Sequence, residues 1–344
     1  MFFLIDSILM SFGCSLTLSN RSILYKVINI FLGVWLTLDN IHFVAGRLYK
    51  PSHSLTTNLR AISFITGVVT TQVLLILRRR KIGRLLTKLI TLTDTTTQQY
   101  LKKLSIALIA HYILSLIRGI GFTLSIVTND NVLERSVRGF FFWSDQVGNG
   151  HKILFPVTRL FKGLVRDQWN HIGLTLYVYI AISIEKLAHR RMEMELATNE
   201  LKDMIDILII KQKFDSMRGD FEQLFNLLPL IWFSWVFQGS SEVFTIKGNL
   251  KTWFFLDLGQ NLISLFGAIF FINYHRNRCH QLNQRIFYKF ANKWKFNTIS
   301  NIQLIKTQLI SNVEYTALGL FRLDNGLLLS FISGLVTFTV MALQ

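Results

Sequence analysis

Three charged side chains, Arg118, Asp39 and Asp257, each interrupt an apolar run of more than 20 residues. A charge inside a membrane-spanning helix costs about 2.5–3.5 kcal/mol on insertion scales, so it indicates a functional site by default. At a rise of about 1.5 Å per residue, all three lie at similar depth in the external half of their runs. A cavity open to the outside would let them stay hydrated or pair with one another.

Aromatic and polar residues near these charges predict a small-molecule pocket among the third to sixth apolar runs. Aromatic walls with a few polar groups are what such sites generally use. The predicted lining is Arg118, Phe122, Trp169, His171, Tyr177, Trp235, Gln238, Trp253, Asp257 and Gln260. For any single residue, the alternative is an interfacial aromatic or one partner of a buried ion pair.

Patterns of catalytic and metal-binding residues are missing from the sequence. His275 and His280 lack an HExxH context, and neither a P-loop nor a GxGxxG motif occurs. Cys14 and Cys279 are the only cysteines and do not have the spacing of a disulfide framework or a metal site. The sequence therefore predicts no enzyme activity, no cofactor and no metal ion.

The composition is that of a helical membrane protein. Hydrophobic residues make up 51% of the 344 residues and charged residues only 17%, against roughly 25% charged in a soluble domain. The net charge of +17 would suggest nucleic acid in a soluble protein. Here the bases stand between apolar runs, where they determine topology, and no nucleic-acid-binding motif accompanies them. We therefore expect membrane lipids as partners and no nucleic acid.

Seven apolar runs predict seven membrane-spanning helices. The first six cover about 23–48, 55–77, 104–127, 164–187, 221–244 and 252–274, and the last ends the chain at Gln344. Lys and Arg are concentrated after the second and sixth runs, which places these segments in the cytoplasm. The N-terminus is then cytoplasmic and the C-terminus extracellular.

The segments between the runs complete an all-α membrane protein with long intracellular helical extensions. The expected parts are a cytoplasmic or interfacial segment 1–22, spans one to four within 23–187 with an external loop 128–163, a cytoplasmic amphipathic helix 188–220, spans five and six within 221–274, a cytoplasmic anchor 275–320 and a C-terminal helix 321–344.

The C-terminal segment carries a short signature. Thr337, Phe338, the five residues Thr339 to Leu343 and Gln344 resemble the signature of arthropod gustatory receptors, which is Thr-Tyr, five hydrophobic residues and Gln-Phe. Upstream, Gly319 to Asp324 look like the segment that precedes the same helix in that family. Two departures are Phe338 in place of Tyr and the absence of a Phe after Gln344.

This resemblance implies a chemosensory receptor that is similar to insect odorant receptors. Proteins of this kind form tetrameric ligand-gated cation channels, in which the last helix lines one central pore and intracellular helices make most subunit contacts. The resemblance implies a non-selective cation channel in the plasma membrane of a chemosensory neuron, opened by a small external tastant. It also implies a homotetramer or a heterotetramer with other gustatory receptors, and a role in acceptance or avoidance.

Helical steps of three and four back from Gln344 give a predicted pore stripe. Its members are Gln344, Met341 or Val340, Thr337, Ser333 or Gly334, and Ser330. Met341 or Val340 is the gate candidate, because hydrophobic narrowings close pores by dewetting. The alternative is that small residues at this spacing only pack helices together.

Other membrane-protein classes fit the sequence less well. A G-protein-coupled receptor would have its N-terminus outside and DRY-type and NPxxY-type motifs, which do not occur here. A transporter of a small solute, the second functional interpretation, should show repeated halves or broken midplane helices. A membrane-embedded enzyme such as an acyltransferase should show a paired acid and base within a span.

Overall fold

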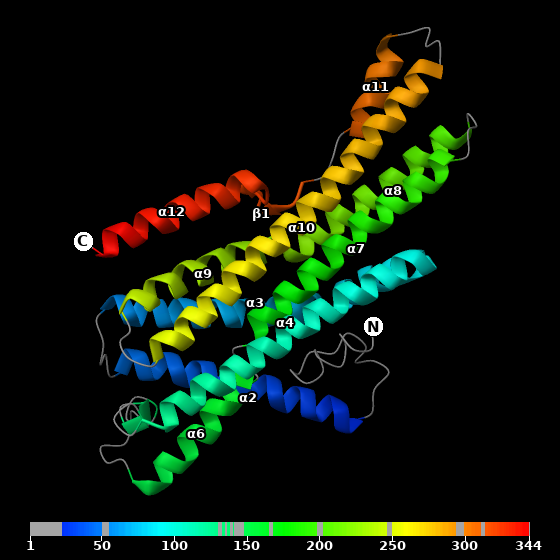
Figure 1. The fold of residues 1–344 in the computed structure, drawn as a ribbon. Coiled ribbons are helices and arrows are strands. Elements are labelled where there is room, and N and C mark those ends of the chain that lie inside the picture. Colours follow the sequence, from blue (N-terminus) through cyan, green and yellow to red (C-terminus); the bar gives the residue numbers. More distant parts are fainter. Residues whose placement is uncertain are drawn as a thin grey trace.

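The computed structural model is a bundle of helices with one small pair of strands before the last helix (Figure 1). It describes residues 23–49, 55–129, 133–134, 136–137, 140, 148–164, 168–197, 202–245, 250–293, 299–310 and 314–343. Its elements are α2 (Ile23–Tyr49), α3 (Leu55–Leu92), α4 (Thr95–Val127), α6 (Asn149–Leu164), α7 (Trp169–Ala197), α8 (Lys202–Phe225), α9 (Leu228–Thr245), α10 (Leu250–Lys293), α11 (Ile299–Ile310), β1 (Thr316–Ala317), β2 (Phe321–Arg322) and α12 (Asn325–Leu343). The helical fold class predicted from the sequence is confirmed.

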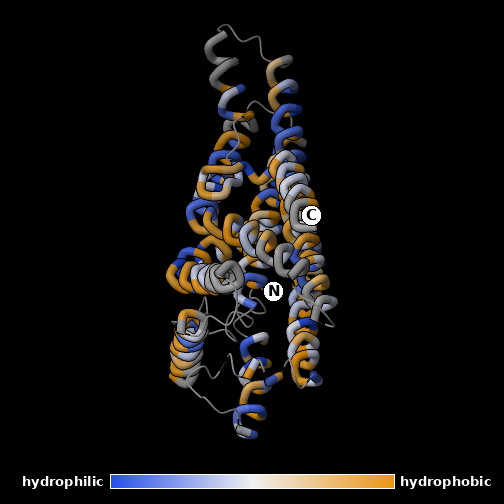
Figure 2. Tube along the Cα trace, turned by 90° about the vertical axis from the view of Figure 1, so that its left-hand side faces the viewer, coloured by the Kyte–Doolittle hydropathy of each residue, from blue (hydrophilic) through white to orange (hydrophobic). Residues whose placement is uncertain are grey.

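The most apolar helices leave hydrophobic side chains on the outside of the bundle. Within the described residues, three stretches are long and apolar enough to cross a membrane: Thr95–Val127, the stretch Asn149–Leu196 that contains α6 and α7, and Phe255–Ala291. Leu228–Phe237 and Asn325–Thr337 are shorter apolar helices. Figure 2 shows apolar residues recurring along the outer side of the bundle as well as in its interior. An outward apolar surface of this extent suits a lipid environment.

A continuous helix, α10, joins two segments that the sequence analysis separates. Its first half is the predicted sixth span, and its second half carries the bases that were assigned to the cytoplasmic anchor 275–320. The sequence 250–293 contains no proline, so the helix is not interrupted where its composition changes. The rest of the predicted anchor contains α11 and β1, whereas β2 occupies the start of the predicted C-terminal helix 321–344, which begins as α12 at Asn325. The predicted amphipathic helix 188–220 is divided between the end of α7 and α8.

Residues 149–164 fold as helix α6, although the sequence analysis places them in an external loop. Helix α6 packs along α4, and Gly163 faces Gly119 so closely that a Cβ atom at Gly163 would lie 3.7 Å from the Gly119 carbonyl oxygen. Lys162 is buried in this contact region. The two glycines let the backbones approach, as small residues do between membrane helices.

A buried cluster of polar groups ties α7, α8 and α10 together, and we call Glu185, Arg218, Cys279 and Tyr315 the anchor cluster. Arg218 donates two hydrogen bonds to the Glu185 carboxylate, at 2.7 and 2.8 Å. Tyr315 donates to the same carboxylate at 2.8 Å, and the Cys279 thiol donates to the Glu185 carbonyl oxygen at 3.1 Å. Asp215 binds Arg218 from the same helix at 2.6 Å. Every member of the anchor cluster is buried, so these bonds replace water completely.

The linker, residues 314–324, connects the anchor cluster to α12. Glu314 forms ion pairs with Arg276 on α10 and Arg322 on β2. The Thr316 backbone N–H donates to Glu222 on α8 at 2.7 Å, and the Thr316 hydroxyl donates to the same carboxylate at 3.1 Å. The linker is therefore fastened to both α8 and α10 immediately before α12 begins.

A tight turn reverses the chain within the linker. Leu318 and Gly319 have positive φ angles of 55° and 71°, a region that favours glycine. The turn brings β1 and β2 together with Ala317 opposite Phe321. Asp324 then accepts a hydrogen bond from the Leu327 backbone N–H at 2.9 Å, which satisfies one free N–H at the start of α12.

Removing the central carboxylate of the anchor cluster is expected to destabilise the protein strongly. Glu185→Ala should lower the free energy of unfolding by about 3 kcal/mol or more, because Arg218 stays buried and loses both of its hydrogen bonds to Glu185. Tyr315→Phe should cost about 1.5–3 kcal/mol, as expected for one hydrogen bond to a charged group. The control is Lys88→Ala, whose exposed pair with Asp220 is worth less than about 1 kcal/mol. Denaturant unfolding in detergent, followed by tryptophan fluorescence, measures all three. A Glu185→Ala loss as small as the control's would contradict the role of the cluster.

The carboxyl group that holds Thr316 should make stability depend on pH. Burial raises the pKa of Glu222 to about 7, although hydrogen bonds from Thr316 act in the opposite direction. Although the run predicted as the fifth span starts at 221, Glu222 lies in α8, and the apolar helix of this region begins only at Leu228. Between its ordinary pKa of 4.5 and about 7, the folded chain binds more protons than the unfolded chain. Its contribution to stability is therefore lost as the pH rises through this window.

Glu222→Gln removes this titration and keeps an oxygen that can accept from Thr316. The melting temperature of the variant relative to the natural protein should rise between pH 5 and pH 8. Thermal unfolding of both proteins at four pH values in this range measures the difference. A difference that stays constant with pH would show that Glu222 does not titrate there.

Candidate functional site: a polar cluster within the helix bundle

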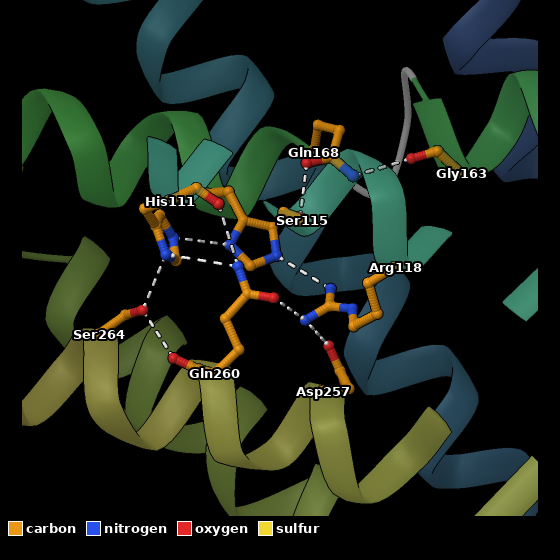
Figure 3. Close-up of polar contacts among 9 residues, drawn as sticks. His111, Ser115, Arg118, Gly163, Gln168, Asp257, Gln260 and Ser264 are labelled. Atoms are coloured by element: carbon orange, nitrogen blue, oxygen red, sulfur yellow. Dashed lines mark hydrogen bonds and ion pairs between the residues drawn. The ribbon is translucent and has the colours of Figure 1, made fainter. Parts of the chain in front are cut away.

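Six polar side chains from three helices meet inside the bundle, and we call them the polar cluster (Figure 3). Its members are His111 and Arg118 on α4, His171 on α7, and Asp257, Gln260 and Ser264 on α10. Residues spaced by three, four or seven lie on one face of a helix, which explains why α4 and α10 each present their members together. The helices α4, α7 and α10 contact one another pairwise, so the three faces converge.

An ion pair neutralises the charge of the polar cluster. Arg118 and Asp257 approach to 2.5 Å, and both side chains are mostly shielded from solvent. Arg118 also donates to the Gln260 side-chain oxygen at 2.8 Å. A paired charge is far less costly in an apolar bundle than an isolated one. The cluster is thus polar but has no net charge.

The donor and the acceptor of each hydrogen bond in the polar cluster can be assigned, starting from Arg118. Arg118 can only donate, so the Nε2 atom of His171, 3.3 Å away, accepts, and the proton of this ring is on Nδ1. That Nδ1 atom lies 3.3 Å from Nε2 of His111, which then accepts and carries its own proton on Nδ1. Nδ1 of His111 lies 3.1 Å from the Ser264 hydroxyl, and Ser264 donates to the Gln260 carbonyl oxygen at 2.6 Å. With both histidines neutral, this assignment satisfies the hydrogen bonds from Arg118 to Ser264. The Gln260 amide nitrogen, 3.3 Å from the protonated Nδ1 of His111, then donates to the His111 main-chain carbonyl oxygen at 3.1 Å.

A second set of hydrogen bonds supports the polar cluster from α4. Ser115 lies one turn from His111 and Arg118, and its hydroxyl donates to the Gln168 side-chain oxygen at 2.8 Å. Gln168 in turn donates to the Gly163 carbonyl oxygen at 2.9 Å. These buried bonds connect the end of α6 and the start of α7 to α4, and Figure 3 shows them beside the cluster. They fix the position from which His171 enters the cluster.

Aromatic rings border the polar cluster on two sides. The Trp235 ring on α9 meets His171 edge to face with ring centroids 4.9 Å apart. The Trp253 ring on α10 lies so close to Gly121 on α4 that a Cβ atom there would overlap it. Glycine at 121 therefore makes room for the tryptophan.

The structure brings together only part of the predicted pocket. Arg118, His171, Asp257 and Gln260 are in direct contact, with Trp235 beside them. Three other predicted members have different surroundings: Phe122 lies under the Arg159 guanidinium, Trp169 is fully buried in the core, and Tyr177 packs against Phe221, Phe225 and Trp232. The Gln238 side chain lies outside the described residues.

Two members, His111 and Ser264, were absent from the predicted pocket. His111 stands seven residues before Arg118, and Ser264 stands seven residues after Asp257. Spacing from the charged residues along each helix is therefore the signal that would have found them.

The third predicted charge, Asp39, belongs to a different site. It pairs with Lys162 of α6 at 2.6 Å, and the two side chains are only 6% and 3% exposed. The Lys162 ammonium also lies 4.3 Å from the centre of the Phe140 ring. The partner was not predicted because Lys162 lies in the segment that the sequence analysis assigns to a loop.

The predicted pore residues lie on the open side of α12. Phe331 packs against Phe233 and Phe266, which turns one face of α12 toward α9 and α10. Ser330, Ser333, Thr337 and Val340 are exposed, and Thr337 donates to the Ser333 carbonyl oxygen at 2.9 Å. The side chains of Phe338 and Met341, and all of Gln344, lie outside the described residues.

No group of three or more His, Cys, Asp or Glu side chains that could hold a metal ion occurs in the part of the chain that the structure describes. The two histidines of the polar cluster use their ring nitrogens for hydrogen bonds to Arg118, to each other and to Ser264. The chemistry available here is therefore hydrogen bonding and charge pairing.

Comparison with solved structures identifies the fold. The insect olfactory receptor OR5 from Machilis hrabei in complex with eugenol superposes with a TM-score of 0.73 and 13% sequence identity, over 100% of this chain and 97% of that one. A second structure of the same receptor gives a TM-score of 0.72 and 14% identity, over 99% of this chain and 97% of that one. No family model matches the sequence, and no curated protein matches it significantly. The chain has the fold of these insect olfactory receptors along its whole length.

The Arg118–Asp257 pair should show strong energetic coupling. Asp257→Leu leaves Arg118 without its counterion, and Arg118→Met leaves the carboxylate alone, so each single variant should be destabilised. The double variant should be less destabilised than the sum of the two by about 1–3 kcal/mol. As a control, Arg118→Met combined with Asp39→Leu should be additive within about 0.5 kcal/mol, because Asp39 belongs to another ion pair. Denaturant unfolding in detergent measures both cycles, and equal coupling in the two would contradict the assignment.

Proposed function

We propose that this protein is a chemosensory receptor of the insect type that works as a ligand-gated cation channel in the plasma membrane of a sensory neuron. The observation that carries the proposal is the fold, which is shared with an insect olfactory receptor over the full length of the chain. A buried polar cluster in the bundle adds a place where a small molecule can act.

The C-terminal signature favours a gustatory rather than an olfactory receptor. Thr337, the five residues between Phe338 and Gln344, and Gln344 itself have the spacing of the gustatory receptor signature. A tastant from outside would then be the natural ligand, and the response would drive acceptance or avoidance.

The exposed face of α12 supports a pore formed by several copies of the chain. Leu329, Val336 and Val340 are more than half exposed on the side opposite Phe331. Ser330, Ser333 and Thr337 are on or beside that side and give it a polar stripe. In a homotetramer or heterotetramer of the kind that the family resemblance implies, four such stripes would line one channel. Val340 and Met341 would form its hydrophobic narrowing, with Gln344 as a polar ring beside it.

The polar cluster suits an uncharged ligand with hydrogen-bonding groups. Arg118 is already neutralised by Asp257, so an ionic ligand would have to break a close ion pair. Eugenol, which is bound to the structurally similar receptor, is itself a small uncharged phenol. We therefore propose that the ligand rearranges the hydrogen bonds around Arg118, His171 and Gln260 and shifts the helices that carry them.

Current recording tests this function directly. The chain is expressed in a cell without a native response, and whole-cell currents are recorded over a panel of uncharged tastants. A ligand-dependent cation current is expected, and Arg118→Ala and Asp257→Ala should each change the agonist response. Stoichiometric substrate flux without channel-like current would favour the transporter interpretation instead. Normal agonist responses in both variants would remove these residues from the ligand site.

Variants of the C-terminal helix test the pore. Met341→Ala should widen the narrowing and raise the current that flows without ligand, and Gln344→Ala should change the unitary conductance or the ion selectivity. Leu320→Ala, in the exposed turn of the linker, is the control and should leave both properties unchanged. Unchanged conductance and selectivity in both pore variants would show that α12 does not line the channel.

A further inference from the structure

The outward face of α3 changes from apolar to basic along a single stripe. Val73 is 44% exposed and Leu77 is 76% exposed. Arg80, Lys81 and Arg84 continue the stripe at helical spacing, and all three side chains are exposed. The surface that suits lipid tails is thus followed directly by a cationic surface, which we call the basic face of α3.

The opposite side of the same helix keeps this face turned outward. Ile82, Leu85, Leu86 and Leu89 are each at most 3% exposed and pack into the core. Rotating α3 to hide the bases would expose these four side chains to water. The orientation of the basic face is therefore fixed by packing.

The charges of the basic face are available to a partner. Among the residues that the structure describes, Arg80, Lys81 and Arg84 make no hydrogen bond and no ion pair. One turn further, Lys88 lies 3.7 Å from Asp220. Three unpaired cations at adjacent positions form a strongly positive patch that attracts anions.

The distance of each base from the membrane determines which kind of anion can bind to the basic face. This step rests on the proposed function, because it takes Leu77 as the last residue in contact with lipid tails. The headgroup layer is about 5–7 Å thick on each side of the bilayer. Arg80 and Lys81 then lie within it, whereas Arg84 lies about 10 Å beyond Leu77, past the cytoplasmic edge of the layer.

We propose that the basic face of α3 binds the headgroup of a polyphosphorylated inositol lipid in the cytoplasmic leaflet. The phosphates on the inositol ring project beyond the ordinary lipid phosphate, so one headgroup can contact Arg80, Lys81 and Arg84 together. Phosphatidylserine carries its charge closer to the membrane and reaches only the first two. Clusters of Lys and Arg next to a membrane helix are generally suited to such lipids.

The helix that carries the lipid site also contacts the region that holds the linker. Arg78, on the side of α3 that faces α8, donates to the carbonyl oxygens of Gln223 and Leu224 at 2.8 and 2.6 Å. The neighbouring carbonyl of Asn226 accepts a bond from the backbone N–H of Leu318 in the linker. The helix to which the headgroup binds is therefore joined through Arg78 to the end of α8 that holds the linker.

Binding of a soluble short-chain lipid to the purified full-length chain tests the proposal. The probes are dioctanoyl phosphatidylinositol 4,5-bisphosphate and dioctanoyl phosphatidylserine, and native mass spectrometry in detergent gives the bound fraction of each. The inositol lipid should bind at least about tenfold more tightly than the serine lipid. The triple variant R80Q/K81Q/R84Q should weaken it more than about tenfold, because each base near an anionic headgroup contributes substantially.

Two matched variants distinguish binding at a specific site from a general effect of positive charge. K213Q/R285Q/K306Q removes three exposed cations elsewhere on the chain and should change the affinity less than about threefold. R80K/R84K keeps the charge and should retain binding. If the triple variant does not give a monodisperse protein, R84Q alone replaces it, with an expected loss of at least about threefold.

The proposal is overturned if the triple variant or its R84Q replacement binds the inositol lipid like the natural protein. Equal loss in the K213Q/R285Q/K306Q control, or equal affinity for the serine lipid, would overturn it as well. The measurement needs no ligand-gated current, so a failure of the channel function and a failure of lipid binding would be seen separately.

Discussion

A fully buried carboxylate, Glu185, sets the arrangement of the part of the helix bundle in which α7, α8 and α10 meet the linker. An unpaired charge at this depth would cost several kcal/mol, so its neighbours must satisfy it. Arg218 from α8, Tyr315 from the linker and Cys279 from α10 all bond to this residue. Three helices and the start of the last segment are thus held at one point. Only a few residues of the linker separate this point from α12, so the same point also fixes where α12 begins.

In the apolar part of the bundle, the members of the polar cluster must likewise be satisfied by their neighbours. Polar groups among membrane helices have few alternative partners, so a network is stable when every member is bonded. The chain from Arg118 through His171 and His111 to Ser264 meets this condition with one placement of protons. The polar cluster contains few hydrogen bonds that could be exchanged. A group that enters must supply a new hydrogen bond for each one that it breaks, so the region is sensitive to such a group.

The sequence carries much of the fold and about half of the site. Apolar runs and basic blocks are long signals, and they predict a helical membrane protein without reference to distant contacts. Charged residues in these runs point to Arg118 and Asp257, since few arrangements make such charges tolerable. Which carboxylate pairs with which base depends on how helices cross, so the partner of Asp39 could be found only from the folded chain.

Other differences also have physical causes. Tyr177 has the composition expected of a pocket residue, but α7 turns it toward Phe221 and Trp232. Helix α6 was missed because His151, Lys152 and Lys162 lower the hydropathy of a segment whose helix is stabilised by packing on α4. His111 alone among apolar residues resembles an ordinary core histidine. The role of His111 depends on α10, which brings Ser264 to the same level in the bundle.

The unbroken length of α10 has a mechanical consequence. Gln260 and Arg276 lie 16 positions apart on this helix, about 24 Å along its axis, and no proline between them provides a hinge. A stiff rod cannot absorb a displacement at one end by bending in the middle. Any tilt imposed near Gln260 must therefore arrive at Arg276 and its partner Glu314 as a movement of the whole rod. Collective helix motions of this kind take place on the microsecond-to-millisecond timescale.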